Sequence, residues 1–423
     1  MYSPQLIAIR RAELERVLAN ELPRGGLREY TLAEVDEFNQ RFAGLFGSKG
    51  EQTRPLAPEE QAFVVNEQLL GKIDCAYFSE RYTTINLAGS GIGRLYPLWE
   101  SQRLILDEIG RLEWERYDTG YPDGVLVDCL KDRQVGASTL AVAILFQRLV
   151  THAHTFGLLA ADVPDQSDFM WDMFERMYDH LPWYMQPSVA ERVKNDEFVL
   201  ATGTRLFWGA SKSTRGADRP TRTAQEGTKG QLGRGKTLSV CVNSELATWT
   251  NPNQIDTALD PAIPRSLRSF WLKESSANGR GPSNWWWAEW QLAKSGKGRA
   301  RAIFIPWYAE QSRHHKPAPV GWSPSTDTLA HARRAEESGP RWMHRAVTLT
   351  RDQLYWYETE RDLAIAKDNL SGFMQEHPAD DDEAFQYASK SAISLQVRER
   401  IRAQARPMKG MIEVTAHKDL AHV

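Results

Sequence analysis

Short apolar runs alternate with longer amphipathic stretches between about residue 95 and residue 306. This alternation predicts an α/β domain with a mostly parallel sheet, because a strand covered on both faces reads as a continuous apolar run. The helices expected between the runs cover residues 138–150 and 166–180. The expected strands are residues 124–130, 155–161, 205–209, 238–242, 269–272 and 301–306.

The segments on either side of this region differ from it in pattern. Residues 1–90 are polar with helical spacing at 12–19 and 32–46, which predicts a helical subdomain. After residue 306 the chain is rich in proline and glycine, so we expect irregular structure until helices resume at 350–369 and 392–406. The predicted parts are a helical subdomain at 1–90, a core domain at 91–310 and a lid or linker segment at 311–423.

A candidate phosphate-binding loop lies between the predicted strand 124–130 and the predicted helix 138–150. Such loops end in Gly-Lys-Ser/Thr, whose lysine reaches the terminal phosphate and whose hydroxyl holds Mg²⁺. Here Ala137 occupies the lysine position, while Lys131 and Arg133 supply positive charge at the other end of the loop. We therefore expect a nucleotide site in an α/β P-loop NTPase fold of the RecA/ASCE-like class. Its other expected contacts are Gln134, Gly136, Ala137, Ser138 and Thr139.

A nucleotide hydrolase also needs an acidic residue at the end of a buried strand, to polarise the attacking water and help hold the metal. Glu245 follows the predicted strand 238–242 closely and is the candidate catalytic carboxylate. Ser244 replaces the aspartate usual before it, so Mg²⁺ would lie on Ser138, the phosphates, water and Ser244, with Glu245 as a further candidate metal residue. The alternative is a surface glutamate that opens a helix.

Three further features are compatible with nucleotide chemistry, although each has an ordinary alternative. Small polar residues after strand 269–272 suit a switch that senses the γ-phosphate, or form a simple turn. Arg234, between two glycines, is a candidate arginine contact to a phosphate or a residue of a solvated turn. Gln102 has the groups to bond both edges of adenine. The candidate switch residues are Ser275, Ser276, Ala277, Asn278 and Gly279.

Two conspicuous clusters have structural explanations that we favour. Trp286, Trp287 and Trp290 are spaced as on one helix face, so burial is preferred over stacking on nucleic-acid bases. Residues 380–383, Asp-Asp-Asp-Glu, are expected to open a helix rather than bind a metal. The three cysteines lack zinc-binding spacing and are expected to be buried apolar groups.

Composition narrows the class of protein only slightly. The chain has 423 residues, 41% of them hydrophobic, which is ample for a packed core. We find no signal peptide and no apolar stretch of membrane-spanning length, so we expect a soluble intracellular protein without a membrane partner. Net charge is −3, but residues 205–236 carry eight Lys or Arg against two acids, a local charge of +6. That run is either a solvated loop or part of a nucleic-acid contact.

Taken together and in order, these segments resemble the ATPase part of the large terminase subunit of tailed bacteriophages and prophages. The resemblance covers nearly the whole chain, including Asn66, Glu67 and residues 77–82 near the N-terminus. Near the C-terminus His377 stands where the family's Glu-Tyr-Pro segment has tyrosine. The matching segments are residues 131–139, 233–237, 244–249, 274–279, 304–307 and 375–385.

The resemblance implies an ATP- and Mg²⁺-dependent motor that moves double-stranded DNA into a procapsid from the host cytoplasm. It assigns Lys131 and Arg133 to phosphate contacts, Glu245 to catalysis and residues 275–279 to coupling. The implied partners are the portal protein, the small terminase subunit and further copies of the chain in a ring. The family's nuclease domain has no counterpart before Val423, so no DNA cleavage by this chain is expected.

Two other functions remain open from the sequence. One is a helicase-like ATPase that acts on nucleic acid without packaging, since the same strand, loop and helix serve both. The other is an assembly or DNA-docking module that has lost hydrolysis, which Ala137 and Ser244 would explain.

Overall fold

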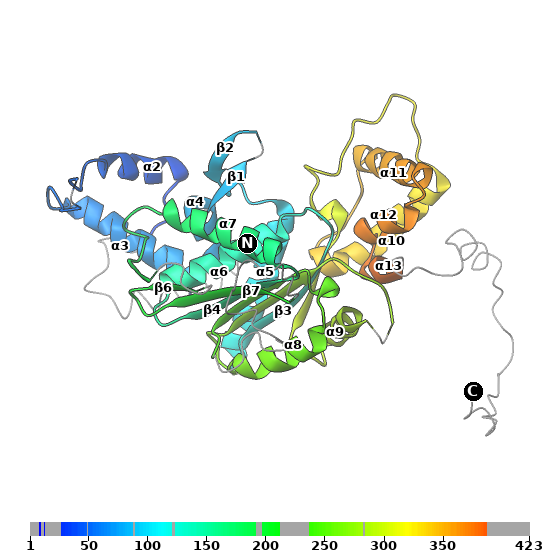
Figure 1. The fold of residues 1–423 in the computed structure, drawn as a ribbon. Helices are drawn as coiled ribbons and strands as arrows, with labels where there is room; N and C mark the ends of the chain where they lie inside the picture. The colour runs from blue at the N-terminus through cyan, green and yellow to red at the C-terminus, as the bar shows by residue number, and fades with distance from the viewer. Residues whose placement is uncertain are drawn as a thin grey trace, which may run out of the picture. The chain divides into compact units, whose positions relative to one another are not determined.

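The computed structural model describes residues 8, 9, 12 and 27–386, apart from 49, 88, 121–122, 192–196, 212–236 and 282–283. All of these belong to one compact unit, drawn as a ribbon in Figure 1. Arg234, the predicted helix 392–406 and all of the predicted helix 12–19 except Ala12 lie outside the described residues. The three-part division of the chain stays a prediction.

The described residues form an eight-stranded sheet in the order β10-β3-β9-β8-β4-β7-β6-β5. The six strands expected from the apolar runs are all present and run parallel, while β5 and β6 extend one edge antiparallel. The sequence analysis did not predict these two edge strands. The strands are β3 (Val125–Lys131), β4 (Phe156–Ala161), β5 (Val189–Glu191), β6 (Glu197–Leu200), β7 (Arg205–Ala210), β8 (Val240–Ser244), β9 (Phe270–Ser275) and β10 (Arg301–Ile305).

The order of the central strands confirms the predicted fold class. If β3, β4, β8, β9 and β10 are numbered one to five, they lie in the order five-one-four-three-two, with β7 added beyond β4. This is the arrangement of RecA-like P-loop NTPases. It brings the carboxyl ends of β3, β8 and β9 to one edge, where open α/β sheets bind their ligands.

Helices cover both faces of the sheet. Figure 1 shows α5 (Glu100–Thr119), α6 (Ala137–Thr151) and α7 (Pro164–Asp179) on one face, and α8 (Pro252–Leu259) and α9 (Trp285–Lys294) on the other. Helix α6, which follows the candidate loop, is buried nearly all round between the sheet and its helical neighbours. A helix with apolar residues on every side is stable only in such a place, so its start is rigidly positioned.

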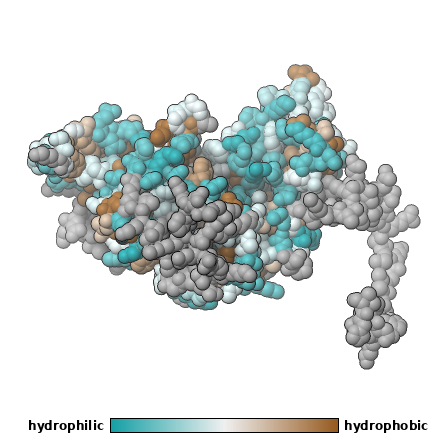
Figure 2. Space-filling model, in the orientation of Figure 1, coloured by the Kyte–Doolittle hydropathy of each residue, from teal (hydrophilic) through white to brown (hydrophobic). Residues whose placement is uncertain are grey.

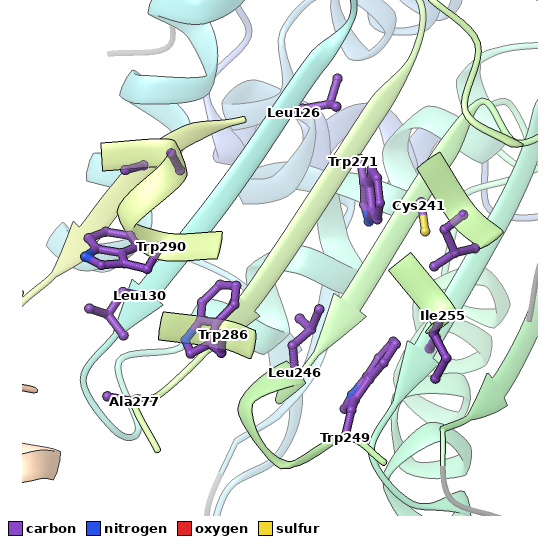
Figure 3. Close-up of a cluster of buried hydrophobic side chains, with 14 of the residues drawn as sticks. Leu126, Leu130, Cys241, Leu246, Trp249, Ile255, Trp271, Ala277, Trp286 and Trp290 are labelled. Carbon is purple, nitrogen blue, oxygen red and sulfur yellow. The ribbon is translucent and has the colours of Figure 1, made fainter. Parts of the chain in front are cut away.

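Two of the three tryptophans predicted to be buried, Trp286 and Trp290, are core residues, while Trp287 is only partly buried against the same cluster. Trp286 and Trp290 are 1% and 0% exposed and pack against the sheet, beside Leu130 and Trp271 in the cluster that Figure 3 shows. The indole nitrogen of Trp290 donates to Asp381, at 2.9 Å. Asp381 opens α13 (Asp381–Gln386), so the acidic run begins a helix as expected.

The region before the sheet is largely helical, as predicted, with an unforeseen hairpin. Its buried Glu67 accepts hydrogen bonds from Asn66, Tyr77 and Tyr82. The resemblance to large terminases near the N-terminus rests on these residues. Their hydrogen bonds hold the helix of residues 58–73 against the helix of residues 75–82. The elements are α2 (Leu32–Arg41), α3 (Pro58–Ile73), α4 (Cys75–Tyr82), β1 (Thr84–Leu87) and β2 (Gly91–Arg94).

The prediction that helices resume only at residue 350 is wrong. Helix α10 (Thr326–Met343) begins directly after the proline-rich passage, where the Ser325 hydroxyl accepts a hydrogen bond from the backbone of Thr328. Pro340 in its last turn obscured the helical pattern. The remaining elements are α11 (Arg351–Ala366), α12 (Leu370–Glu376) and the short 3-10 helices η2 (Leu246–Thr248), η3 (Asp260–Ala262) and η4 (Trp307–Ala309).

Exposed apolar groups on the face seen in Figure 2 are small and separated by hydrophilic residues. Large exposed patches usually mark interfaces, and the described part of this face offers none of obvious extent. Within the described residues, no helix combines the length and the apolar character needed to cross a bilayer.

A buried lysine lies on the α8 and α9 face of the sheet, at the centre of a group of acids. The Nζ atom of Lys273 is 3.2 Å from Asp128, 3.6 Å from Asp256 and 3.1 Å from Glu289. Burial raises the pKa of Asp128 to about 6, although the attraction of Lys273 opposes that rise. The lysine therefore limits the cost of burying Asp128 inside the protein.

We predict that Lys273→Met lowers the free energy of unfolding by about 3–5 kcal/mol, the usual cost of leaving a buried charge unpaired. An aspartate whose pKa is raised in the folded state stabilises the protein less as pH rises from about 4 through that raised pKa. Loss of Lys273 moves the pKa of Asp128 further up, so the deficit should grow between about pH 5 and pH 8. Urea denaturation at about pH 5 and at about pH 8 measures the loss in free energy of unfolding. The control is Lys297→Met, which removes an exposed lysine. A deficit equal to that of the control would contradict the prediction.

Candidate active site

The lysine that the sequence analysis placed at the start of the loop points into the site. Lys131 is the last residue of β3 and its side chain is 7% exposed. Its Nζ atom lies 2.9 Å from the carboxylate of Glu245 and 3.3 Å from that of Glu274. Residues far apart in the sequence thus meet at the carboxyl ends of three parallel strands.

Glu274 is the buried centre of this group, and the sequence analysis did not select it as a site residue. It lies in β9, where it pairs with Ser244 of β8 across the parallel ladder. Its Oε1 atom accepts hydrogen bonds from Ser138, at 2.8 Å, and Ser244, at 2.5 Å. No local signal distinguishes it, because Lys273 and Ser275 on either side are polar as well.

Electrostatics favour a charged lysine at this place. Burial lowers the pKa of Lys131, but the attraction of Glu274 and Glu245 outweighs it, so that this pKa is raised. Burial raises the pKa of Glu274, which the Lys131 ammonium opposes. The ammonium therefore stays protonated at neutral pH, as a phosphate-binding group must.

Glu245 differs from Glu274 in exposure and backbone conformation. Its side chain is 32% exposed, whereas that of Glu274 is 1% exposed. Its backbone is left-handed, with φ 56° and ψ 44°, an uncommon state for a residue other than glycine. The turn directs Glu245 to the end of the sheet, where solvent can reach its carboxylate. Such backbone outliers concentrate at functional sites.

The loop itself has the backbone that phosphate cradles use. Gly136 has φ +74° just before α6 begins, and a Cβ atom there would lie 2.8 Å from Nε2 of Gln102. Gln102 donates to the Gly136 carbonyl and accepts from the backbone of Trp99. Both ends of its amide are thus engaged within the chain, and its predicted contact with adenine stays a prediction.

The other loop residues separate into buried and exposed groups. Ala137 is buried, whereas Ser138 and Thr139 are partly accessible at the start of α6. Gln134 is exposed, has a left-handed backbone and accepts a hydrogen bond from Arg313. Arg133 is 64% exposed and pairs with Glu376, at 2.6 Å. Unlike Lys131, it does not join the buried carboxylates.

The segment predicted to couple hydrolysis to movement connects two neighbours of the site. The hydroxyl of Ser275 accepts from the backbone of Ala247, and the side-chain amide of Asn278 donates to the carbonyl of the same residue. The carbonyl of Ala277 accepts from Gln375 in α12. Through these bonds, β9 is tied both to the turn that carries Glu245 and to α12.

Residues 375–377, at the end of α12, contact the loop as well. Glu376 binds Arg133, and Nδ1 of His377 lies 2.9 Å from Asp132. Together with the bond from Gln375 to Ala277, three consecutive residues connect α12 to both the loop and β9. The sequence analysis singled out this segment only through the family resemblance.

Comparison with known proteins gives structural matches alone, because no family model and no curated protein matches the sequence. The solved structures that align include the large terminase of a thermophilic bacteriophage, at 12% identity and a TM-score of 0.36. They also include the HK97 bacteriophage large terminase, at 12% identity and a TM-score of 0.42. The ATPase domain of the Thermus phage P74-26 large terminase aligns at 16% identity and a TM-score of 0.34.

The aligned parts differ in extent. They cover 60% of this chain for the terminase of the thermophilic bacteriophage, 70% for that of HK97 and 63% for the P74-26 domain. Of the other protein they cover 53% for the first terminase, 52% for that of HK97 and 92% for the P74-26 domain. The chain therefore spans about half the length of the first two proteins. These structures come from the family that the motifs resemble, but at such TM-scores they do not decide membership. The strand order and the loop remain the basis of the fold assignment.

We predict that Lys131 and Glu274 are strongly coupled in stability. Lys131→Met alone leaves the buried Glu274 with less compensation, so the double variant with Glu274→Gln should be less destabilised than the sum of the single changes. The expected coupling is about 0.5–3 kcal/mol, measured by urea denaturation. The exposed pair of Arg133 in the loop and Glu376 in α12 is the control, expected at about 0.2–1 kcal/mol. Equal coupling in both pairs would argue against a buried ion pair.

Proposed function

We propose that this chain is an ATPase that binds ATP with Mg²⁺ at the loop of residues 132–136 and hydrolyses it. The observation that carries the proposal is the Lys131 ammonium held between Glu245 and Glu274 beside the start of α6. A cation, a partly exposed carboxylate and a hydroxyl meet there next to a helix N-terminus, whose free amides favour anions. These are the groups that phosphoryl transfer to water requires.

The donor atoms around Lys131 fit magnesium as well as phosphate. Ser138, Glu245 and Glu274 supply oxygen atoms, which Mg²⁺ prefers. The Oε2 atom of Glu274 is buried and lies 3.3 Å from the Lys131 ammonium, without a closer hydrogen bond among the described residues. Bound Mg²⁺ would neutralise part of the negative charge on the β- and γ-phosphates.

We assign different roles to the two glutamates. On nucleotide binding, Lys131 would exchange part of its contact with Glu245 for the γ-phosphate, which frees that carboxylate to orient a water. Glu245 suits this role because it is accessible, whereas Glu274 is enclosed by Ser138, Ser244 and Lys131. Glu274 would instead hold Ser138 and Lys131 in position.

The contacts of β9 and α12 support a coupling of hydrolysis to movement. Loss of the γ-phosphate changes the partners of Lys131 and Glu245, and Ser275, Ala277 and Asn278 link this region to α12. A displacement of the Glu245 turn would therefore be passed to α12 and to the helices packed against it. Small changes at a γ-phosphate are commonly transmitted in this way.

The family resemblance supports double-stranded DNA as the object of that movement. We propose that the chain acts in viral DNA packaging, as a ring of copies with a portal protein and a small terminase subunit. Contacts would be mainly with DNA phosphates, so that binding is independent of sequence and weakens steeply with salt. Arg234 remains a candidate phosphate contact in its own or a neighbouring copy.

The experiment compares phosphate release by the wild type and Glu245→Ala, with and without double-stranded DNA. Loss of the water-orienting carboxylate should reduce the rate at least about a hundredfold while fluorescent ATP analogues still bind. Glu197→Ala, which removes a carboxylate on the distant edge strand β6, is the control and should keep wild-type activity. Equal background rates in wild type and Glu245→Ala would favour a docking module, and DNA strand separation would favour a helicase.

Lys131 gives a second, separable prediction. Lys131→Ala should weaken ATP binding more than ADP binding, because the ammonium is expected to contact the γ-phosphate. Arg133→Ala should have a smaller effect, since Arg133 is exposed and paired with Glu376. Equilibrium binding of ATP and of ADP to each variant measures the ratio of the two dissociation constants. An unchanged preference in Lys131→Ala would contradict the assignment of this residue.

A further inference from the structure

Asp132, the residue after Lys131, lies with two histidines from distant segments. Nδ1 of His377, just after α12, is 2.9 Å from Oδ1 of Asp132. Nε2 of His314, in the turn after η4, is 3.6 Å from Oδ2. One donor atom from each of the three residues lies within 4.8 Å of the others. Two imidazoles and a carboxylate from three separate segments thus converge on one point.

The tautomer of His314 leaves a lone pair facing this point. Its Nδ1 atom is 2.7 Å from the carbonyl oxygen of Trp307, a contact that requires a proton on Nδ1. In a neutral ring with this tautomer, Nε2 is a bare acceptor, and it faces Asp132. A backbone carbonyl on the far nitrogen is the arrangement that orients metal-binding histidines.

Asp132 brings a second acceptor to the same place. It is 1% exposed, and its Oδ2 atom makes no hydrogen bond among the described residues. Two acceptors, Oδ2 and Nε2 of His314, therefore face each other with no donor between them. Such a buried pair is unfavourable until a hydrogen-bond donor or a cation lies between the two atoms, and an ion fits this place because both atoms are metal-binding types.

The spacing and surroundings suit a small transition-metal ion. Tetrahedral zinc with ligands at about 2.0–2.1 Å sets donor atoms roughly 3.3 Å apart, between the two distances of 2.9 and 3.6 Å. Trp356 packs against both rings, with centroids 4.6 Å from His314 and 5.2 Å from His377. Phe373 lies against His377 as well, so the site has an apolar shell.

We propose that Asp132, His314 and His377 bind a divalent transition-metal ion of the zinc class, separate from the magnesium of the nucleotide. Imidazole nitrogens select such ions over Mg²⁺, which prefers oxygen donors. The ion displaces the proton that His377 shares with Asp132, and water takes the fourth position. It fastens the phosphate loop to the η4 turn and to the end of α12. This site goes beyond the ATPase activity proposed above.

The test is Zn²⁺ binding by metal-free full-length protein in excess Mg²⁺, measured by competition with a chromophoric chelator. We expect one tight site per chain, and at least about tenfold weaker binding in His314→Gln, His377→Gln and Asp132→Asn. The control is His315→Gln, because His315 is exposed and its Nδ1 contacts the Gln311 carbonyl instead. Circular dichroism checks that each variant is folded.

Two further readouts separate a bound ion from a structural hydrogen-bond cluster. Zn²⁺ should raise the melting temperature of the wild type and His315→Gln but not of the three ligand variants, since a ligand stabilises only the state that binds it. Co²⁺ should give the visible absorption of a tetrahedral site in the same two proteins. Absence of stoichiometric Zn²⁺ binding, or equal binding by His314→Gln, would overturn the proposal. None of these measurements depends on ATP hydrolysis.

Discussion

The site depends on one buried cation. Lys131 ends a strand, and its ammonium is enclosed by Glu245 and Glu274. A buried carboxylate such as Glu274 is tolerable only with compensating charge and hydrogen bonds, and Lys131, Ser138 and Ser244 provide them. The same enclosure aligns the ends of β3, β8 and β9, so the groups expected to meet a nucleotide are positioned before it arrives.

The contacts of α12 extend this arrangement to the rest of the chain. Residues 375–377 bond to Ala277, Arg133 and Asp132 in turn, so one helix end touches both the loop and the strand that carries Glu274. A motor needs such a connection, because chemistry at the phosphate must change the position of another element. The proposed metal site would make this connection firmer at His377, without altering the residues around Lys131.

Much of the fold follows from the sequence, because each of the six parallel strands contains a short apolar run. Strands β3, β8 and β9 are buried along their whole length. The edge strands β5 and β6 escaped prediction because short, half-exposed strands acquire their conformation from pairing with β7. Helix α10 was hidden by Pro340 near its end. Tertiary context thus decides the elements that lack a strong local pattern.

The site was predictable in part for similar reasons. Lys131, Ser138 and Glu245 follow from the loop pattern and from a strand end, and they lie together. Glu274 was missed because nothing local distinguishes a glutamate near the end of a strand; only the register between β8 and β9 brings it to Ser244. Asp132 and its two histidines are equally invisible in sequence, since their spacing in the chain exceeds any short motif.

The position of Lys131, the proposed phosphate contact, on a strand has an electrostatic consequence. In the usual loop the ammonium stands on the first helical turn, where it adds to the positive end of the helix dipole and is repelled by it. Here the cation belongs to β3 and the dipole to α6, so the two positive sources approach an anion from separate directions. The loop between them can then change shape while the charged group remains fixed to the sheet.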